Sequence, residues 1–402
     1  MDRTGVNASL LQREKIEQIP GILRQTGIDC WLIWVRETSQ MLDPTLPLVL
    51  GCDLVWISAL LFTRSGERIA IVGNFDAGGL PAELFDRIVP YTKGIGEPLR
   101  QELFRIAPQA IAINESVNDV SADGLTAGMK RVLTGILAET PFADRLQSAE
   151  PIVGRLRGRK TKTEVSLIRR AVEITETIYH ELADYLRVGL TEREIHAHVH
   201  QRMEAYGVGS AWQASSNPAV DAGPNKEFGH VGPTDGRTQA GQLLHFDFGV
   251  RYNDYCSDLQ RMYFFGRPHE IPSEIARAFV TVREAIRIAA EALRPGAVGK
   301  DIDAIARRFV IDRGYPEYGH ALGHQLGRQA HDGGTLLAPA WKRYGDSPYG
   351  TVEEGNIFTL ELNVPTQHFG RVSLEEDVLV TESGCEFLST PQRELICLPQ
   401  RS

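Results

Sequence analysis

Two aspartates, Asp247 and Asp258, lie eleven positions apart in the segment LLHFDFGVRYNDYCSDLQRMY, residues 243–263. Alternating apolar and polar residues at the start of this segment predict a strand in which Asp247 lies on the face opposite Phe246. The letters RYND predict a turn, and the extended run after it carries Asp258 back toward the first strand. Two carboxylates brought so close repel each other unless they share a proton or bind a metal ion. Taken alone, the segment is equally compatible with two surface acids beside a turn.

Histidines are concentrated in the segment GHALGHQLGRQAHD, which contains His320, His324 and His331. Its glycines disfavour a helix and instead predict a loop or bulged strand that brings the imidazoles to one crowded site. A single histidine there could be a core residue, but three of them beside Asp332 favour a function. A fourth histidine, His230, ends a loop-rich segment, and the glycines around it permit the close approach of backbone or ligand.

Two predicted strands near the C-terminal end each place a glutamate opposite an apolar face. In NIFTLELNV this residue is Glu361, and in RVSLEEDVLVT it is Glu375. Either glutamate alone is typical of a charge at a strand edge. Together with Asp247, Asp258 and His324 they form a set of four carboxylates and one imidazole, whose charge two divalent cations would balance. The set therefore favours a two-metal site that acidifies a bound water.

A different group of histidines follows the capping-box pattern of Thr191 and Glu194. His196 and His200 are four residues apart on one face of the predicted helix, where such a pair could bind zinc. A metalloprotease helix requires a glutamate directly after the first histidine, and this chain has none after His196. A solvent-facing cluster is therefore the favoured interpretation.

The predicted elements divide the chain into two domains, residues 1–152 and 153–402. The first alternates helical and extended patterns, with a helix over 10–26 and a buried strand in CWLIWV, which is typical of an α/β domain. The second begins with a short basic stretch and a long amphipathic helix. Helices predicted over 274–293 and 301–312 would cover the sheet that carries the acids.

The composition of the 402 residues is that of a globular protein, with 42% hydrophobic and 24% charged residues. The formal net charge of −9 argues against nucleic-acid binding, which needs a basic surface. The five cysteines are scattered and form no CxxC motif, which favours reduced thiols in a cytoplasm-like compartment. The sequence shows no signal-peptide pattern and no apolar run long enough to cross a bilayer. We therefore expect a soluble, cytoplasmic protein that binds neither nucleic acid nor membranes.

The order of the candidate ligands, two aspartates eleven positions apart and then a histidine and two glutamates, resembles that of the pita-bread metallopeptidases. This family includes methionine aminopeptidase, Xaa-Pro aminopeptidase and prolidase. The resemblance covers about residues 153–390, and the pattern HxxxHxLGxxxHD around His324 is most similar to the Xaa-Pro peptidases. It implies a creatinase-like α/β N-terminal domain followed by an α+β pita-bread domain with a curved antiparallel sheet backed by helices.

The resemblance also implies a role for each candidate ligand. Asp247 would bind the first metal ion only, while Asp258 and Glu375 would bridge both ions. His324 and Glu361 would complete the coordination of the second ion, and Glu361 would also take the proton of the attacking water. The two ions are expected to be divalent. Manganese is the expected metal, and zinc and cobalt are the alternatives.

Other positions match residues that contact the substrate in this family. His230 and His331 match the histidines that hold the substrate carbonyl and stabilise the oxyanion, and His320 matches one that lines the substrate pocket. A family arginine commonly lies two residues before the last glutamate, where this chain has Ser373. Arg371, four residues before that glutamate, is the candidate for the same substrate-binding role.

Further departures from the family pattern occur next to the candidate ligands. Gln325 follows the ligand histidine, where glycine is usual. Glu361 is followed by Leu-Asn-Val instead of Pro-Gly, and Pro365 occupies the position of a tyrosine. These departures predict a different hydrogen-bonding network around the metal ions, which affects rate and substrate length more than reaction type.

By this resemblance the protein is expected to be a metallopeptidase, an Xaa-Pro dipeptidase or Xaa-Pro aminopeptidase. The first expectation is prolidase-like hydrolysis of the peptide bond preceding proline in Xaa-Pro dipeptides, by a hydroxide held between two metal ions. The alternatives are an aminopeptidase acting on longer peptides, a metal-free hydrolase like creatinase, and a catalytically inactive binding protein. The expected partners are a short proline-containing peptide and a second copy of the chain in a homodimer.

Overall fold

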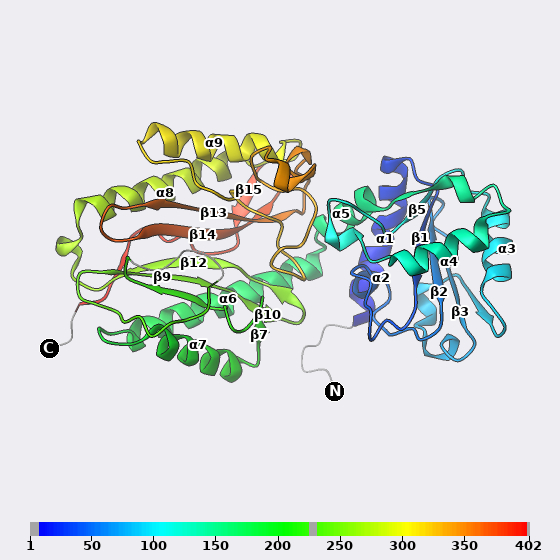
Figure 1. Cartoon of the computed structure of the whole chain (residues 1–402), viewed down its shortest axis with the longest axis horizontal. Helices are drawn as coiled ribbons and strands as arrows, with labels where there is room; N and C mark the ends of the chain where they lie inside the picture. Colours follow the sequence, from blue (N-terminus) through cyan, green and yellow to red (C-terminus); the bar gives the residue numbers. More distant parts are fainter. Residues whose placement is uncertain (1–7, 225–230, 400–402) are drawn as a thin grey trace. The chain divides into compact units, whose positions relative to one another are not determined.

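The computed structural model of the protein describes residues 8–224 and 231–399. The chain forms two compact units, Met1–Arg157 and Gly158–Ser402. Each unit contains its own main sheet, and helices accompany both sheets (Figure 1).

A six-stranded mixed sheet forms the centre of the first unit, in the order β4-β3-β2-β1-β5-β6. Its strands are β1 (Cys30–Val35), β2 (Ser58–Thr63), β3 (Arg68–Gly73), β4 (Arg87–Tyr91), β5 (Ile111–Ile113) and β6 (Leu146–Ser148). The α-helices are α1 (Ala8–Thr26), α2 (Leu46–Val49), α3 (Gly96–Ile106), α4 (Ala127–Leu137) and α5 (Glu150–Gly158). β2 runs antiparallel to both β1 and β3, while the other neighbours are parallel. The α/β class predicted for this part of the chain is confirmed.

The packing of β1 explains why its sequence, CWLIWV, is apolar throughout. Trp31 and Ile33 pack with α1 on one face of the sheet, whereas Leu32 and Trp34 pack with α3 and α4 on the other. A strand covered by helices on both faces needs no polar alternation. The helix predicted over 10–26 is α1, and Gly27 follows it with a φ of +73°, which favours glycine.

The predicted domain division at residue 152 falls inside α5. Ile152, Val153 and Leu156 of this helix are buried in the core of the first unit. The division between the compact units follows Arg157, and the long amphipathic helix after it is the first helix of the second unit.

An antiparallel sheet in the order β13-β14-β12-β9-β8 forms the centre of the second unit. Its strands are β8 (Ala219–Ala222), β9 (Leu243–Phe248), β12 (Leu259–Phe264), β13 (Ile357–Pro365) and β14 (Arg371–Val380), with β15 (Cys385–Phe387) beside β14 and β16 (Ile396–Cys397) beside β12. A smaller sheet contains β7 (Gly209–Ser210), β10 (Val250–Tyr252) and β11 (Tyr255–Cys256). The predicted antiparallel sheet is therefore present.

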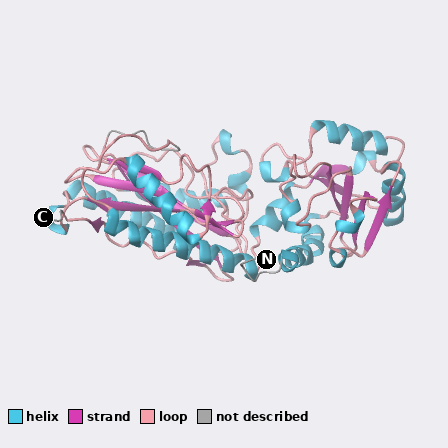
Figure 2. Ribbon diagram, turned by 90° about the horizontal axis from the view of Figure 1, so that it is seen from below, coloured by secondary structure: helices cyan, strands magenta, loops and turns pink. Residues whose placement is uncertain are grey.

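Long helices lie along the main sheet of the second unit (Figures 1 and 2). They are α6 (Lys162–Tyr185), α7 (Glu192–Tyr206), α8 (Ser273–Ala292) and α9 (Gly299–Asp312). Tyr179 of α6 packs edge-on against Phe246 and Phe248 of β9, and α8 buries its apolar side against β13 and β14. The predicted capping box opens α7 at Thr191. No helix in the described parts of the chain is both long and apolar enough to cross a membrane.

β9 and β12 form the hairpin that the sequence predicts. At Gly249, directly after β9, a Cβ would lie only 1.9 Å from the carbonyl oxygen of Ser257, so glycine is required. Beyond this point β10 and β11 pair up to the turn predicted from RYND. Asn253 and Asp254, which connect the two strands, both have positive φ. The pairing places Asp247 opposite Gln260 and leaves Asp258 directly before β12.

Candidate metal centre

One face of the main sheet carries a row of polar side chains that crosses four adjacent strands. The register pairs Asp247 of β9 with Gln260 of β12, Gln260 with Glu375 of β14, and Glu375 with Glu361 of β13. Directly paired residues of antiparallel strands point to the same face. The order of the strands, which Figure 1 shows, therefore brings three predicted ligands together from distant parts of the sequence.

His324 reaches this row from a loop that runs along the edge of β13. The backbone N–H of Glu361 donates to the carbonyl of Leu322, and that of Thr359 donates to the carbonyl of His324. A Cβ at Gly323 would lie 1.9 Å from the carbonyl oxygen of Thr359, so glycine lets the loop lie against the strand. The glycine-rich segment is thus the loop that the sequence predicts.

The imidazole of His324 lies within 4 Å of three carboxylates. Its Nε2 is 3.7 Å from Oε1 of Glu361, 3.9 Å from Oε1 of Glu375 and 3.9 Å from Oδ2 of Asp258. One possible ligand atom from each of Asp258, His324 and Glu375 lies within 4.8 Å of the others. Atoms about 4 Å apart are too distant for hydrogen bonds but are spaced like two ligands of one ion, each bound at about 2.1 Å.

Asp247 lies at the end of the same row, opposite Gln260, and its charge acts on the carboxyl group of Asp258. The structure therefore gathers all five predicted ligand residues, and their roles as ligands remain predictions. These residues are Asp247, Asp258, His324, Glu361 and Glu375.

The carboxyl groups of this cluster lie together, with Asp258 and Glu375 buried and Asp247 and Glu361 partly buried, and they disfavour one another's ionisation. Burial and then the charge of Asp247 raise the pKa of Glu361 to about 8. Burial and the charge of Asp247 also hold the pKa of Asp258 well above its ordinary value. Burial and the charge of Asp258 raise the pKa of Glu375 well above its ordinary value. No lysine or arginine of the described chain forms an ion pair with Asp258, Glu361 or Glu375. Concentrated charge of this kind is stabilised by a bound cation.

Two buried oxygens of the cluster, Oδ1 of Asp258 and Oε1 of Glu375, have no hydrogen-bond partner within the described chain. Buried polar atoms are costly unless something satisfies them. Manganese, cobalt and zinc ions all bind to sets of ligand atoms made of carboxylate oxygens and one imidazole nitrogen. The residues therefore fit a centre for divalent metal ions.

His331 lies beside the cluster and contacts His324. The two rings pack edge to face with their centroids 4.2 Å apart, and His331 is exposed. The following residue, Asp332, is buried and pairs at 3.2 Å with the buried ammonium group of Lys160. Asp332 therefore anchors the loop, whereas His331 is accessible to a substrate.

His320 and Arg371, two of the predicted substrate-binding residues, are joined by Asn363. Arg371 donates from Nη1 to Oδ1 of Asn363, whose Nδ2 lies 2.7 Å from Nε2 of His320. Burial lowers the pKa of His320 to about 4, so the ring is neutral near pH 7. It then accepts from Asn363 and donates from Nδ1 to the carbonyl of Ala321. The other predicted substrate residue, His230, lies outside the described residues.

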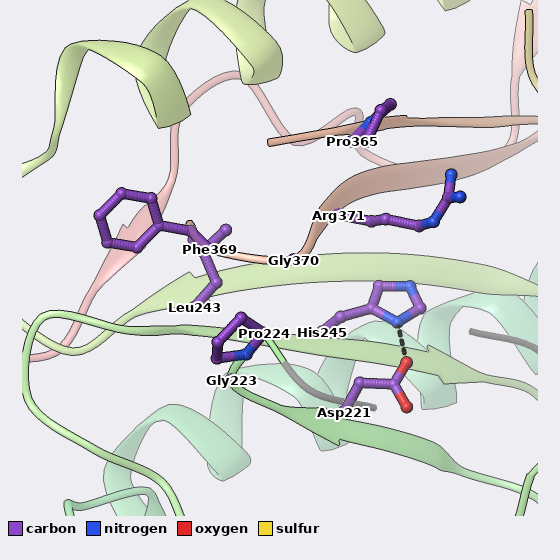
Figure 3. Close-up of a pocket in the computed structure, with 9 residues that line it drawn as sticks. All are labelled: Asp221, Gly223, Pro224, Leu243, His245, Pro365, Phe369, Gly370 and Arg371. Atoms are coloured by element: carbon purple, nitrogen blue, oxygen red, sulfur yellow. Dashed lines mark hydrogen bonds and ion pairs between the residues drawn. The ribbon is translucent and has the colours of Figure 1, made fainter. Parts of the chain in front are cut away.

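A pocket of about 180 Å³ opens between the strands β8 and β9 and the turn that joins β13 to β14 (Figure 3). Figure 3 shows Arg371 on one side of it, and His245 and Asp221 on the other. The remaining lining residues are apolar or glycine: Gly223, Pro224, Leu243, Pro365, Phe369 and Gly370. The pocket therefore combines an apolar wall with a guanidinium group.

Sequence reasoning did not single out His245, Gln260 or Asp221, which lie beside the cluster. Asp221 accepts a hydrogen bond from His245 and raises the pKa of that ring, although burial alone would lower it. The alternation that assigns Asp247 to the polar face assigns His245 to the same face, so this signal could have identified it. The contacts of Gln260 depend on strand order, which no local pattern contains.

The histidines of α7 are half-buried, and the ring centroids of His196 and His200 lie 4.4 Å apart. Nε2 of His196 lies 3.1 Å from the carbonyl oxygen of Ala214, and Nε2 of His200 lies 2.8 Å from that of Asn217. Each of these nitrogens therefore contacts a backbone acceptor.

Comparisons with known proteins agree with this geometry. The profile of metallopeptidase family M24 matches residues 166–382. An uncharacterized peptidase of Staphylococcus aureus (strain bovine RF122 / ET3-1) is 30% identical over 333 residues, which are 82% of this chain and 87% of that protein.

Two solved structures share the fold over nearly the whole chain. The X-Pro aminopeptidase from Thermotoga maritima MSB8 is 24% identical, with a TM-score of 0.69, and the match covers 95% of this chain and 99% of that one. The Xaa-Pro dipeptidase from Bacillus anthracis is 21% identical, with a TM-score of 0.72, and the match covers 96% and 100%. The fold implied by the resemblance is confirmed.

Proposed function

The chain belongs to metallopeptidase family M24, and on this premise we propose that it hydrolyses the peptide bond preceding proline in Xaa-Pro dipeptides. The observation that carries the proposal is the cluster of Asp258, Glu361 and Glu375 around His324, with no lysine or arginine of the described chain paired to these acids. We infer that the site binds two divalent ions, with manganese as the preferred metal.

The five clustered residues would hold the ions. Asp247 would bind one ion, Asp258 and Glu375 would bridge both, and His324 and Glu361 would bind the other. Bound ions of this kind lower the pKa of a water molecule and polarise a carbonyl oxygen.

The chain's own residues supply the proton transfer and part of the charge stabilisation. Glu361, whose Oε1 lies 3.7 Å from Nε2 of His324, would accept a proton on a carboxylate oxygen and later release it to the leaving nitrogen. His331, exposed beside His324, can donate an imidazole N–H to the oxygen on which negative charge develops. We propose that His230 contributes in the same way.

The pocket in Figure 3 supports a preference for a terminal proline. Leu243, Pro365 and Phe369 give it an apolar wall, and Arg371 places a guanidinium at its rim. A pyrrolidine ring with a free carboxylate would contact both features. The solved Xaa-Pro dipeptidase that shares this fold supports a dipeptide substrate.

The second candidate function is that of an aminopeptidase acting on longer Xaa-Pro peptides, supported by the solved X-Pro aminopeptidase with the same fold. A metal-free hydrolase and an inactive binding protein are disfavoured, because all five ligand positions carry ligand-type side chains that lie together.

The test compares Ala-Pro, Ala-Pro-Ala and Ala-Ala as substrates of the manganese-loaded protein. We expect cleavage of Ala-Pro, no cleavage of Ala-Ala, and loss of activity with a chelator that added manganese restores. Faster cleavage of Ala-Pro-Ala would favour the aminopeptidase, while activity that survives complete metal removal would contradict both candidates.

The assembly state is proposed from the resemblance alone. We expect a homodimer, which light scattering of the purified protein would detect as twice the chain mass. A monomer mass would contradict this expectation without bearing on the metal centre.

A further inference from the structure

Gln260 occupies the middle of the acidic row. It is paired with Asp247 on one side and with Glu375 on the other, and it is a neutral residue among carboxylates. Its side chain is buried, with 3% of the residue exposed. A buried amide at such a position needs partners for both its nitrogen and its oxygen.

The nitrogen of Gln260 donates to two predicted ligands at once. Nε2 lies 2.8 Å from Oε2 of Glu375 and 3.1 Å from Oε2 of Glu361. An amide nitrogen carries two hydrogens, so both are used. Because the Oε2 atoms turn toward Gln260, the Oε1 atoms of both glutamates are the ones that face His324.

The oxygen of Gln260 is held from the opposite side. It accepts a hydrogen bond from the hydroxyl of Ser373 and lies 3.0 Å from Nε2 of His245. Nδ1 of His245 lies in turn 2.8 Å from Oδ2 of Asp221, the contact drawn as a dashed line in Figure 3. The chain of contacts therefore runs from the wall of the pocket to the carboxylates of the metal centre.

The groups around the amide fix its orientation. Carboxylates that bind a metal ion accept hydrogen bonds but do not donate them, so the nitrogen of Gln260 must face Glu361 and Glu375. Its oxygen then faces the hydroxyl of Ser373, which donates to it. Ser373, which lies where the resemblance leads one to expect an arginine, thus fixes Gln260 instead of reaching a substrate.

We propose that Gln260 is a positioning residue of the metal centre. It holds Glu361 and Glu375 so that one oxygen of each points toward His324, before and after an ion binds. A lysine or arginine here could make the same bonds but would cancel negative charge that divalent cations require. The neutral amide orients the ligands and leaves their charge intact. This inference rests on the proposed function, because it assumes that the cluster binds divalent ions.

The test is manganese binding by the folded protein, measured by titration calorimetry on metal-free samples. Gln260→Met keeps the length of the side chain and removes its donors and its acceptor. Loss of a residue that orients metal ligands weakens metal affinity by about 10- to 100-fold, and we expect a loss in this range. Gln201→Met, the same substitution at an exposed position of α7, should bind manganese as tightly as the unmodified protein does.

A purely structural role for Gln260 would lower the melting temperature without changing the affinity of the folded protein. Wild-type affinity in folded Gln260→Met would therefore overturn the inference. If Gln260→Met does not fold, the same manganese titration is made on Ser373→Ala. This variant keeps Gln260 and removes only one contact to its oxygen. Weaker manganese binding by Ser373→Ala supports the inference, and unchanged binding overturns it. An unmodified protein that binds no divalent ion would instead overturn the proposed function itself.

Discussion

Glu375 and Glu376 are neighbours on β14 and lie in opposite electrostatic environments. Glu376 points to the side of the sheet where Arg261 contacts both of its carboxylate oxygens, at 3.0 and 3.1 Å. Glu375 points to the other side, where it is buried with Asp258 and Glu361. The protein therefore neutralises one of two adjacent buried acids with its own arginine, and leaves the other where a bound ion can balance it.

Asp258→Asn should remove metal binding while the fold survives. The substitution deletes one charge of the cluster but keeps the backbone N–H of residue 258, which donates to Asp377. We expect elemental analysis to show loss of manganese, and manganese no longer to raise the melting temperature. Asp254→Asn, at an exposed turn, should retain its metal. An active Asp258→Asn enzyme with normal metal content would contradict the two-metal proposal.

His331→Ala and His324→Ala should separate catalysis from metal binding. If His331 donates to the developing oxyanion, its loss should lower kcat by about a hundredfold or more, with a smaller change in KM. Its metal content should remain normal, whereas His324→Ala should lose metal. The measurements are metal content, melting temperature and Ala-Pro kinetics on both variants. Loss of metal from His331→Ala, or full turnover, would show that its assigned role is wrong.

The metal-free protein should become less stable as pH rises. Glu361 has a folded pKa of about 8, above its ordinary value of 4.5, so the folded state holds this proton more tightly than the unfolded state. Its contribution to the free energy of unfolding is therefore complete below about pH 4.5 and is lost as pH rises through about 8.

Urea unfolding across this range would measure the decline in stability, and Glu361→Gln should make it shallower. Saturating manganese should reduce the decline as well, because a cation favours the ionised carboxylates. A metal-free protein whose stability rises steadily from pH 5 to pH 8 would be incompatible with this account.

Arg261→Met should destabilise the fold. It would leave the carboxylate of Glu376 buried and uncompensated, which costs about 3–5 kcal/mol of unfolding free energy. The double variant Arg261→Met/Glu376→Gln should recover part of this loss, since the unpaired charge is gone. Denaturant unfolding of the three proteins measures the effect. Equal stability of the single variant and the unmodified protein would mean that the pair contributes nothing.

Local patterns in the sequence were sufficient to predict the elements that carry the site. Strand alternation assigned Asp247, Glu361 and Glu375 to polar faces, and glycine density identified the loop of His324, because side-chain direction and backbone freedom are properties of short segments. The order of these residues also predicted the family, which the comparisons confirm.

Only the tertiary structure decided how those elements meet. The pairing of β12 with β14 places Gln260 against two glutamates, Glu361 and Glu375. The raised pKa of Glu361 likewise requires burial beside Asp247. Strand register and burial depend on contacts between segments more than a hundred residues apart, so no short stretch of sequence contains them.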